Sequence, residues 1–338
     1  MNVWKGAGIA VGAVGVVVGA GFAAQRVAAR RLRMAPDPDA GREFVEQFES
    51  THRVATLDGG ELFVVEHGHG PPIVLVHGVT LSIGTWAKQW HSLSEAGFRV
   101  VAYEQRGHGG STVGRSGHSV ENLGADLKCV IEELDLHDAV VVGHSMGGIA
   151  VQSFCIDFAD VAHQRVAGIV LLSTLARSPV AANRRLARTS GWAIDRWPDS
   201  SAALRSRDLG LVLTRVGFGR NPAARDIEST REMILATSSS TRRSAIAALI
   251  GFDLTKRLCE IDRPTLVIGG SADVMTPLAE SRRLARHIRG ARLEVLDGGG
   301  HMLMFERAEQ LDDLITDFAH QVPRGDQAGS GSAVGAPG

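Results

Sequence analysis

The chain has 338 residues, 44% of them hydrophobic, and a formal net charge of −1. This length can form one large core or two modest ones, and the near-neutral charge gives no indication of nucleic-acid binding. The cysteines are Cys129, Cys155 and Cys259, which are too few for a disulfide framework and lack the spacing of metal ligands. We therefore expect buried, reduced thiols and no metal site.

The first predicted element is an uncharged stretch of 19 residues, from residue 6 to residue 24. A helix of this length, at about 1.5 Å per residue, would span roughly the 30 Å hydrocarbon core of a bilayer. Arg26, Arg30, Arg31 and Arg33 follow it, so the positive-inside rule puts the downstream side in the cytoplasm. We therefore predict that residues 1–34 form an anchor with a basic flank. Membrane lipid would be its partner, and the protein would be a single-pass plasma-membrane protein with a cytoplasmic domain.

A cleaved signal peptide and a dinucleotide-binding loop are two other interpretations of this stretch. Small residues near Ala23 would permit cleavage, but the arginines just beyond are unfavourable for translocation. Residues 19–24 imitate a glycine-rich nucleotide loop after a strand. That loop needs a following helix and a second strand, whereas the chain reaches Pro36 and Pro38. We favour the anchor over both.

After a linker at residues 35–50, short apolar runs alternate with helical patterns over residues 51–321. Asp58-Gly59-Gly60 joins the first two runs and favours a hairpin, whereas helices separate the later runs, which is typical of a covered parallel sheet. We predict an α/β domain with a mostly parallel eight-stranded sheet covered by helices on both faces. The expected strands are 53–57, 61–67, 73–76, 99–103, 139–142, 167–172, 265–269 and 293–296; the expected helices are 86–96, 119–134, 147–158, 277–289 and 307–321. Residues 322–338, which become rich in glycine, serine and alanine, are expected to form a disordered tail.

Polar, glycine-rich turns follow several of these strands. Ligands of parallel sheets bind beyond the carboxyl ends of the strands, so we expect these turns to meet at one edge and form the site. The turns are residues 77–80, 104–109 and 143–147, together with the loops that contain Asp273 and His301.

Ser145 lies in the sequence Val-Val-Gly-His-Ser-Met-Gly-Gly, between a predicted strand and a predicted helix. A strand that turns at once into a helix strains the serine backbone, and Gly143 and Gly147 remove the Cβ atoms that would collide there. The turn exposes the Ser145 hydroxyl and points the Met146 N–H at an oxyanion formed on an attacked carbonyl. The alternative is a tight turn with an incidental serine.

A serine nucleophile needs a base within reach and a third group that orients the base. His301 is the candidate base, because a glycine-rich loop between a strand and a helix can place its imidazole over the sheet edge. Asp273 is the candidate acid. The alternatives are an incidental histidine in a turn and an acid that only begins the helix near Pro277. His77 and His144 are expected to pack and hydrogen-bond locally.

The sequences HGVT, GHSMGG, SADVMTP and GGGH, with Ser, Asp and His in that order, resemble the α/β-hydrolase fold over about residues 50–321. The resemblance implies Ser145 as nucleophile, His301 as base and Asp273 as its orienting acid. It also implies an oxyanion hole formed by the backbone N–H groups of Val79 and Met146. Haloalkane dehalogenases and epoxide hydrolases of this fold carry aspartate at the position of Ser145. The expected chemistry is therefore acyl transfer through an acyl-serine, without cofactor or metal.

One departure from the family pattern is Glu104, which stands where the family's D-x-R-G-x-G turn has aspartate. Since that turn shapes the pocket floor, the change leaves the expected chemistry intact.

The segment 174–262 lies where the family inserts a lid between the sixth and seventh strands, and it is predicted to be a helical cap. Up to residue 231 it carries eleven arginines against five acidic residues. This surface is either a solvated face or one that meets an anionic membrane surface. Its apolar residues could line an acyl-chain pocket or hold the cap together; they are Trp192, Trp197, Leu209, Leu211, Leu213 and the run 245–252.

The function predicted from these features is a membrane-tethered serine hydrolase of carboxylic esters, esterase- or lipase-like, acting on apolar or lipid-like substrates. A perhydrolase or a serine peptidase could use the same Ser, His and Asp. A hydrolase fold that only binds a ligand is the alternative from another class.

Overall fold

The computed structural model describes residues 24–42, 48–179, 181 and 201–324. In this part of the chain, eight strands form one sheet in the order β1-β2-β4-β3-β5-β6-β7-β8. Their bounds are β1 Ser50–Ala55, β2 Glu61–His67, β3 Pro72–Val76, β4 Arg99–Tyr103, β5 Ala139–His144, β6 Val166–Leu172, β7 Thr265–Gly270 and β8 Arg292–Leu296. All eight predicted strands are confirmed.

The direction of the strands follows from their sequences. β1 pairs antiparallel with β2, and β2 pairs antiparallel with β4, whereas every pair from β4 to β8 is parallel. Every residue of β5, β6 and β7 is buried, as expected for apolar runs covered on both faces. The edge strand β1 instead alternates between exposed and more buried residues. The predicted α/β architecture is therefore confirmed.

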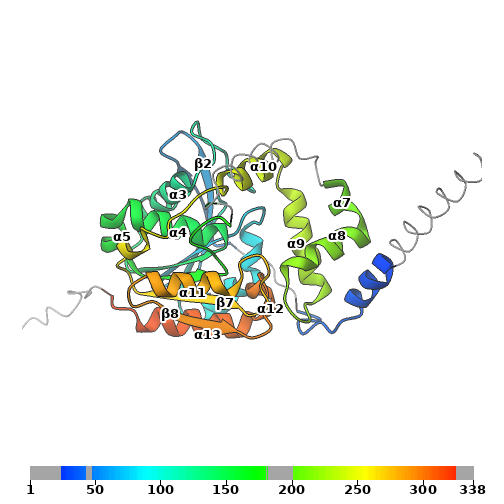
Figure 1. The fold of residues 1–338 in the computed structure, drawn as a ribbon. Helices are drawn as coiled ribbons and strands as arrows, with labels where there is room; N and C mark the ends of the chain where they lie inside the picture. Colours follow the sequence, from blue (N-terminus) through cyan, green and yellow to red (C-terminus); the bar gives the residue numbers. More distant parts are fainter. Residues whose placement is uncertain (1–23, 43–47, 180, 182–200, 325–338) are drawn as a thin grey trace, which may run out of the picture.

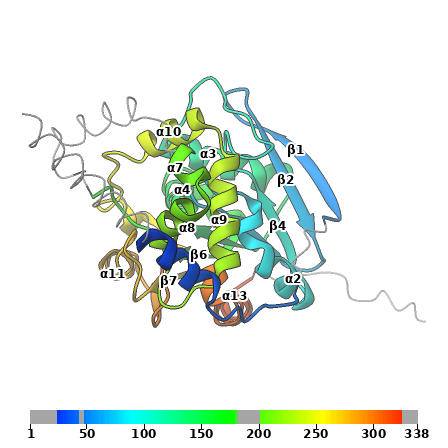
Figure 2. The same cartoon turned by 90° about the vertical axis from the view of Figure 1, so that its right-hand side faces the viewer.

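Helices cover the two faces of the sheet (Figures 1 and 2), and a separate hydrophobic core lies on each face. Val141 of β5 belongs to one core, while its neighbours Val140 and Val142 belong to the other. This alternation follows from the two-residue period of a strand. The first core includes residues of α3 (Val120–Glu133), α4 (Met146–Asp157), α5 (Ala159–Arg165) and α11 (Leu278–His287); the second includes residues of α2 (Ala87–Glu95), α12 (Leu303–Glu306) and α13 (Ala308–Gln321).

A helical cap connects β6 to β7, as predicted, and lies at the right of Figure 1. Its described helices are α7 (Ser201–Arg205), α8 (Arg207–Thr214), α9 (Ala224–Ala236) and α10 (Ser239–Ala248). A 3-10 turn at Arg215–Gly217 follows α8. Residues 182–200 lie outside the described part of the chain, so the predicted lining residues Trp192 and Trp197 cannot be placed.

The structure contradicts the predicted plasma-membrane location. No helix in the described ranges is both long enough and apolar enough to cross a bilayer. Residues 6–23 of the predicted span lie outside these ranges, and the described helix 24–33 contacts the protein itself. Ala29 is fully buried, and Arg33 Nη1 lies 2.8 Å from Asp208 Oδ1 of α8. The helix 24–33, dark blue in Figure 1, lies beside α8. The arginine flank that suggested a lipid-facing segment is thus partly used in contacts with the cap, and membrane lipid is not supported as a partner.

The predicted linker and tail are only partly described. Asp37 and Asp39 of the linker lie against the cap, and Arg225 Nη1 donates to the Asp39 carbonyl at 2.6 Å. Residues 43–47 and 325–338 lie outside the described part of the chain. Of the predicted tail, Val322 is buried in the second core.

Candidate active site

Ser145 lies on a strained turn between β5 and α4. Its backbone has φ 51° and ψ −115°, and its N–H donates to the Leu172 carbonyl at 3.0 Å. A Cβ atom on Gly143 would lie 2.5 Å from the carbonyl oxygen of Gly147, and one on Gly147 would overlap the Val76 carbonyl. The predicted reason for both glycines is therefore correct, since only glycine lets the chain turn this tightly against β3.

The two predicted oxyanion donors lie on either side of this turn. Met146 is the first residue of α4, so its N–H has no partner within the helix and lies at the positive end of the helix dipole. Val79 belongs to the loop after β3, and this loop lines the same cavity as Ser145. The next residue, Thr80, has φ 63°, and its N–H donates to His108 Nε2 at 3.1 Å.

His301 and Asp273 are directly hydrogen-bonded, although 28 residues separate them. The distance between His301 Nδ1 and Asp273 Oδ2 is 3.0 Å, and both side chains are buried. Asp273 Oδ1 accepts the N–H groups of Met275 and Thr276, each at 2.8 Å, and Oδ2 accepts the Thr276 hydroxyl at 2.5 Å. Four hydrogen bonds thus hold the carboxylate. Because one of them engages His301 Nδ1, Nε2 is the ring nitrogen that remains to act on Ser145.

The surroundings of Asp273 favour its charged form. Burial alone would raise this pKa, but the hydrogen bond and positive charge of His301, together with the two bonds from Thr276, outweigh it and lower the pKa below its ordinary value. An ionised Asp273 can stabilise a protonated imidazole. Asp273 also begins the turn before α11, in agreement with the structural interpretation of this acid, while its role as the catalytic acid stays a prediction.

Ser145 and His301 line one cavity of 310 Å³ between the sheet edge and the cap. Among the described residues of its wall, none is an aspartate, glutamate, lysine or arginine, and the two histidines are His144 and His301. Leu213 lines this cavity, as predicted, but Leu209, Leu211 and the run 245–252 do not. The apolar lining is Val79, Leu81, Leu204, Leu213, Val216, Ile234, Met275 and Met302.

The loop that carries His301 is bonded to the part of the cap that follows α8. The His301 N–H donates to the Gly217 carbonyl at 2.9 Å, and the Arg220 N–H donates to the Gly298 carbonyl at 2.7 Å. Glu306 joins the same two segments, because Oε2 accepts the Gly219 N–H at 2.7 Å and Oε1 accepts the Gly300 N–H at 3.1 Å. Burial raises the pKa of Glu306, although these two backbone donors lower it in part.

His144 is hydrogen-bonded to the loop that carries His301. Its Nε2 donates to the His301 carbonyl at 3.0 Å, so Nε2 carries the proton. Burial, and then the nearby His301, lower its pKa well below the ordinary value, which keeps it neutral. The predicted local hydrogen bond of His144 is therefore wrong, since its bond reaches a loop 157 residues along the chain. The sequence did not predict the contacts of Thr276, Glu306 or His108, because no motif relates these residues to the loops they hold.

No group of three or more His, Cys, Asp or Glu side chains within the described ranges is arranged to hold a metal ion. The groups placed around the cavity are instead a hydroxyl, an imidazole bound to a carboxylate, and backbone N–H donors. Such a set can transfer protons and stabilise a developing negative charge.

Comparisons with known proteins show which family the chain belongs to. The chain is similar to a non-heme haloperoxidase of Rhodococcus erythropolis, with 30% identity over 270 residues that cover 78% of this chain and 97% of that protein. Among solved structures, a hydrolase from Pseudomonas aeruginosa (27% identity, TM-score 0.68) covers 80% of this chain and 98% of its own. An enol-lactonase from Burkholderia xenovorans (27% identity, TM-score 0.68) covers 80% of this chain and all of its own. The family model of the alpha/beta hydrolase fold matches residues 71–308, and the chain belongs to this family.

Proposed function

We propose that the protein is a serine hydrolase that cleaves uncharged, apolar carboxylic esters through an acyl-serine intermediate. The observation that carries this proposal is the composition of the cavity wall. Ser145 and His301 share it, His301 is hydrogen-bonded to the buried Asp273, and the described lining around them is apolar and uncharged. Ester-cleaving and other hydrolytic relatives of the same fold support the reaction class.

In the proposed reaction, His301 Nε2 accepts the Ser145 hydroxyl proton as Oγ attacks the ester carbonyl. The N–H groups of Val79 and Met146 stabilise the resulting oxyanion, and Asp273 stabilises the protonated imidazole. Collapse of the tetrahedral intermediate expels the alcohol, which takes the proton from His301, and leaves Ser145 acylated. Water then attacks the acyl group and gives its proton to His301. The second collapse returns that proton to Ser145 and releases the acid.

The cavity also supports a choice of substrate. Ligand pockets commonly range from about 300 to 1,000 Å³, and this cavity, at 310 Å³, lies at the small end of that range. We expect kcat/KM for p-nitrophenyl esters to be highest for short acyl chains and to fall for a sixteen-carbon chain. An ester whose acyl chain ends in a carboxylate should be cleaved poorly, because no described lining side chain would neutralise the buried charge.

A fluorophosphonate probe and a set of p-nitrophenyl esters test the proposal together. Wild type should be labelled and should turn over the esters, whereas Ser145→Ala should do neither. Ser94→Ala, on α2 and outside the cavity lining, is the matched control and should behave as wild type. Labelling without ester turnover would favour the peptidase alternative, and absence of labelling in wild type would favour a binding module.

Perhydrolysis is a second candidate for the same site, favoured by the relatives whose names are non-heme haloperoxidase or chloroperoxidase. Here hydrogen peroxide replaces water in the attack on the acyl-serine, which yields a peroxycarboxylic acid and restores the Ser145 hydroxyl. Peracid formed from an ester and hydrogen peroxide can be followed by the oxidation of bromide. Equal rates for wild type and Ser145→Ala would rule this candidate out.

A further inference from the structure

The loop at residues 77–83 supplies Val79 and has an unusual conformation at Thr80. A threonine with φ 63° lies in the left-handed region, which a β-branched residue rarely adopts unless its surroundings impose it. Two hydrogen bonds hold the Thr80 backbone. Its N–H donates to His108 Nε2 at 3.1 Å, and its carbonyl accepts the Thr237 hydroxyl of the cap at 3.2 Å.

His108 is suited to accept this N–H because its other nitrogen is already engaged. His108 Nδ1 lies 3.0 Å from the Arg106 carbonyl, so Nδ1 carries the proton and Nε2 presents its lone pair to Thr80. His108 is fully buried. Burial, and then the neighbouring His77, lower its pKa to about 3, so the ring is neutral near pH 7.

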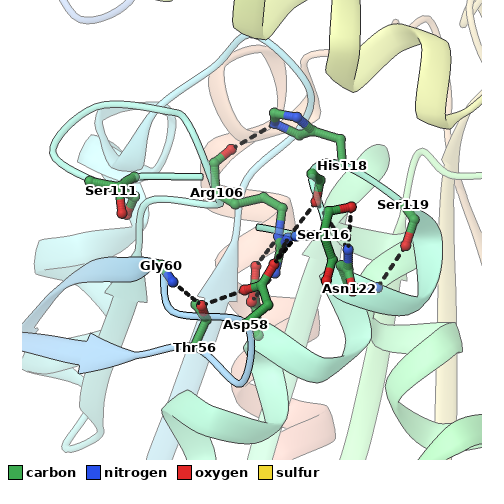
Figure 3. A network of polar contacts seen from close by, with 12 residues as sticks. Thr56, Asp58, Gly60, Arg106, Ser111, Ser116, His118, Ser119 and Asn122 are labelled. Carbon is green, nitrogen blue, oxygen red and sulfur yellow. Dashed lines mark hydrogen bonds and ion pairs between the residues drawn. The ribbon is translucent and has the colours of Figure 1, made fainter. Parts of the chain in front are cut away.

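The turn that carries His108 is fixed to the protein body by Arg106. The guanidinium donates to both carboxylate oxygens of Asp126 at 2.7 Å and to the Gly117 carbonyl. It also donates to Asp58 Oδ2 at 3.3 Å (Figure 3). The Arg106 carbonyl, which accepts from His108, also accepts from His118 Nε2 at 3.1 Å. His108 is thereby attached to a rigid part of the fold.

Other residues of the same turn bind the same loop. The Gln105 N–H donates to His77 Nε2 at 3.0 Å, and the Ile83 N–H donates to Glu104 Oε1 at 3.2 Å. These bonds hold the two ends of residues 77–83, whereas His108 is bonded to the middle of the loop, at the residue next to Val79. Because the Thr80 N–H is directed at His108, it is not available to an oxyanion, in agreement with the preceding residue, Val79, as the expected donor from this loop.

We infer that His108 is a positioning residue that sets the oxyanion loop through the Thr80 N–H and so aims the Val79 N–H at the reacting carbonyl. This inference rests on the proposed function. His108 does not contact the substrate. Its effect should therefore appear in kcat and in the binding of transition-state analogues, with little change in KM.

The test compares His108→Asn with His108→Gln. Asparagine can keep the bond to the Arg106 carbonyl but is too short to accept the Thr80 N–H, whereas the glutamine amide oxygen can take the place of Nε2. Loss of one oxyanion donor lowers kcat by about 10²–10³-fold in a well-studied hydrolase, so a misplaced donor should cost about 10- to 100-fold. We expect this loss in His108→Asn with KM within about twofold, and recovery of most of it in His108→Gln.

A boronic acid inhibitor, which forms a tetrahedral adduct with a serine, supplies a readout that a purely structural role would not change. Its Ki should rise in His108→Asn by the same factor as kcat falls. His118→Phe is the matched control, because His118 donates to the same Arg106 carbonyl without bonding to residues 77–83. It should leave both quantities unchanged. Equal kcat and Ki in wild type and His108→Asn would overturn the inference.

Amide hydrogen exchange separates this inference from the proposed function. The Thr80 amide should exchange faster in His108→Asn than in wild type or His108→Gln, whether or not the protein hydrolyses esters. If wild type is inactive but the Thr80 amide follows this pattern, the proposed function fails and the positioning of the loop stands. If Thr80 exchange is the same in all three proteins, His108 does not hold the loop. Should His108→Asn fail to fold, His108→Phe, which fills the space but cannot accept, replaces it.

Discussion

The two walls of the cavity are held in different ways. The serine wall, residues 77–83 and 143–147, is bonded mainly to the protein body, as in the bonds from the Ser145 N–H to the Leu172 carbonyl and from the Thr80 N–H to His108. Two side chains of the segment 174–262 also bond to it: the Thr174 hydroxyl donates to the Ser145 carbonyl at 2.7 Å, and the Thr237 hydroxyl donates to the Thr80 carbonyl at 3.2 Å. The histidine wall, residues 298–306, is bonded to the cap segment 217–220 through two backbone hydrogen bonds and through both oxygens of Glu306.

This difference shows that the cap of this protein is more than a cover over the cavity. The sheet edge and the elbow glycines determine where the nucleophile lies, but contacts with the cap help to determine where the base lies. Gly219 and Gly300 approach so closely that a Cβ atom on either would overlap the backbone of the other segment. A shift of the cap should therefore disturb His301 before it disturbs Ser145.

The largest expected effect comes from Ser145→Ala, which removes the reacting atom of the serine wall and leaves the histidine wall intact. Loss of the nucleophile lowers kcat by about 10⁶-fold in a well-studied serine hydrolase, and we expect a similar loss of ester turnover here. The free energy of unfolding should stay within about 0.5 kcal/mol of wild type, because the hydroxyl faces the cavity. Wild-type turnover in this variant would show that Ser145 is not the nucleophile.

Asp273→Asn should have the next largest effect and acts on the histidine wall alone. The asparagine Oδ1 can still accept from Met275 and Thr276, so the turn should remain folded. Its amide group would donate toward His301 Nδ1 and favour the tautomer with the proton on Nε2, which cannot accept a proton from Ser145.

We expect kcat for a p-nitrophenyl ester to fall by about 10⁴-fold in Asp273→Asn, as in the best-studied triad. Thr276→Val, which removes the hydroxyl bond to Asp273 Oδ2 and the contact of that hydroxyl with His301 Nδ1 at 3.2 Å, is the graded comparison and should lose far less activity because Asp273 still holds His301. A kcat within threefold of wild type for Asp273→Asn would show that another group orients His301.

Glu306→Gln tests the link between the histidine wall and the cap. Glutamine has one acceptor oxygen where the carboxylate uses two, so either the Gly219 or the Gly300 N–H loses its partner. An unsatisfied buried N–H costs about 1–3 kcal/mol, and we expect the free energy of unfolding to fall by that amount. We also expect a decrease of about tenfold in kcat, measured with a short p-nitrophenyl ester.

The rate of labelling by a fluorophosphonate should fall together with kcat in Glu306→Gln, since His301 assists both reactions. Glu309→Gln, three residues along the chain and exposed, is the matched control and should leave stability and kcat unchanged. If Glu306→Gln is as stable and active as wild type, the contacts between cap and histidine loop are not needed to position the base.

The smallest expected effect is on stability alone and involves Asp312 of α13. Asp312 Oδ1 accepts from Gln89 at 3.0 Å, and the same Gln89 amide donates to the Met304 carbonyl of the histidine wall at 3.2 Å. Burial raises the pKa of Asp312 from 3.8 to about 6, despite the hydrogen bonds from Ser92 and Gln89. A raised pKa means that the folded state holds this proton more tightly than the unfolded state does, so its contribution to stability is present below pH 4 and is lost as the pH rises to about 6.

Asp312→Asn should remove this dependence, because asparagine can bond to both Gln89 and Ser92 without a charge. The variant should be more stable than wild type at pH 8. The shift in the pKa sets an upper limit of ~3 kcal/mol, and we expect a smaller difference because the side chain is partly exposed to solvent. Urea unfolding at pH 4, 6 and 8 measures the difference, and ester turnover at pH 8 should be unchanged. A variant that is less stable than wild type at pH 8 would contradict this account.

The local sequence was sufficient for the features that depend on neighbouring residues. A run such as 139–142 is apolar throughout, so it is buried on both faces and forms an interior strand of a parallel sheet. Gly143 and Gly147 flank a serine at the end of that strand, and their position between a predicted strand and a predicted helix indicates the tight turn. The rule that ligands bind beyond the carboxyl ends of parallel strands then placed Asp273 and His301 in the same region, where the structure joins them.

Tertiary structure alone decided which side chains support these residues. Glu306 meets Gly219 and Gly300, and His108 meets Thr80, only because loops distant in the chain converge at the sheet edge. Hydropathy and spacing carry no signal for such contacts, since the partner is a backbone N–H that every residue except proline has. The arginines after residue 24 were misread for the same reason. A run of charges has the same sequence whether it faces lipid or another part of the protein, and the ion pair between Arg33 and Asp208 exists only in the folded chain.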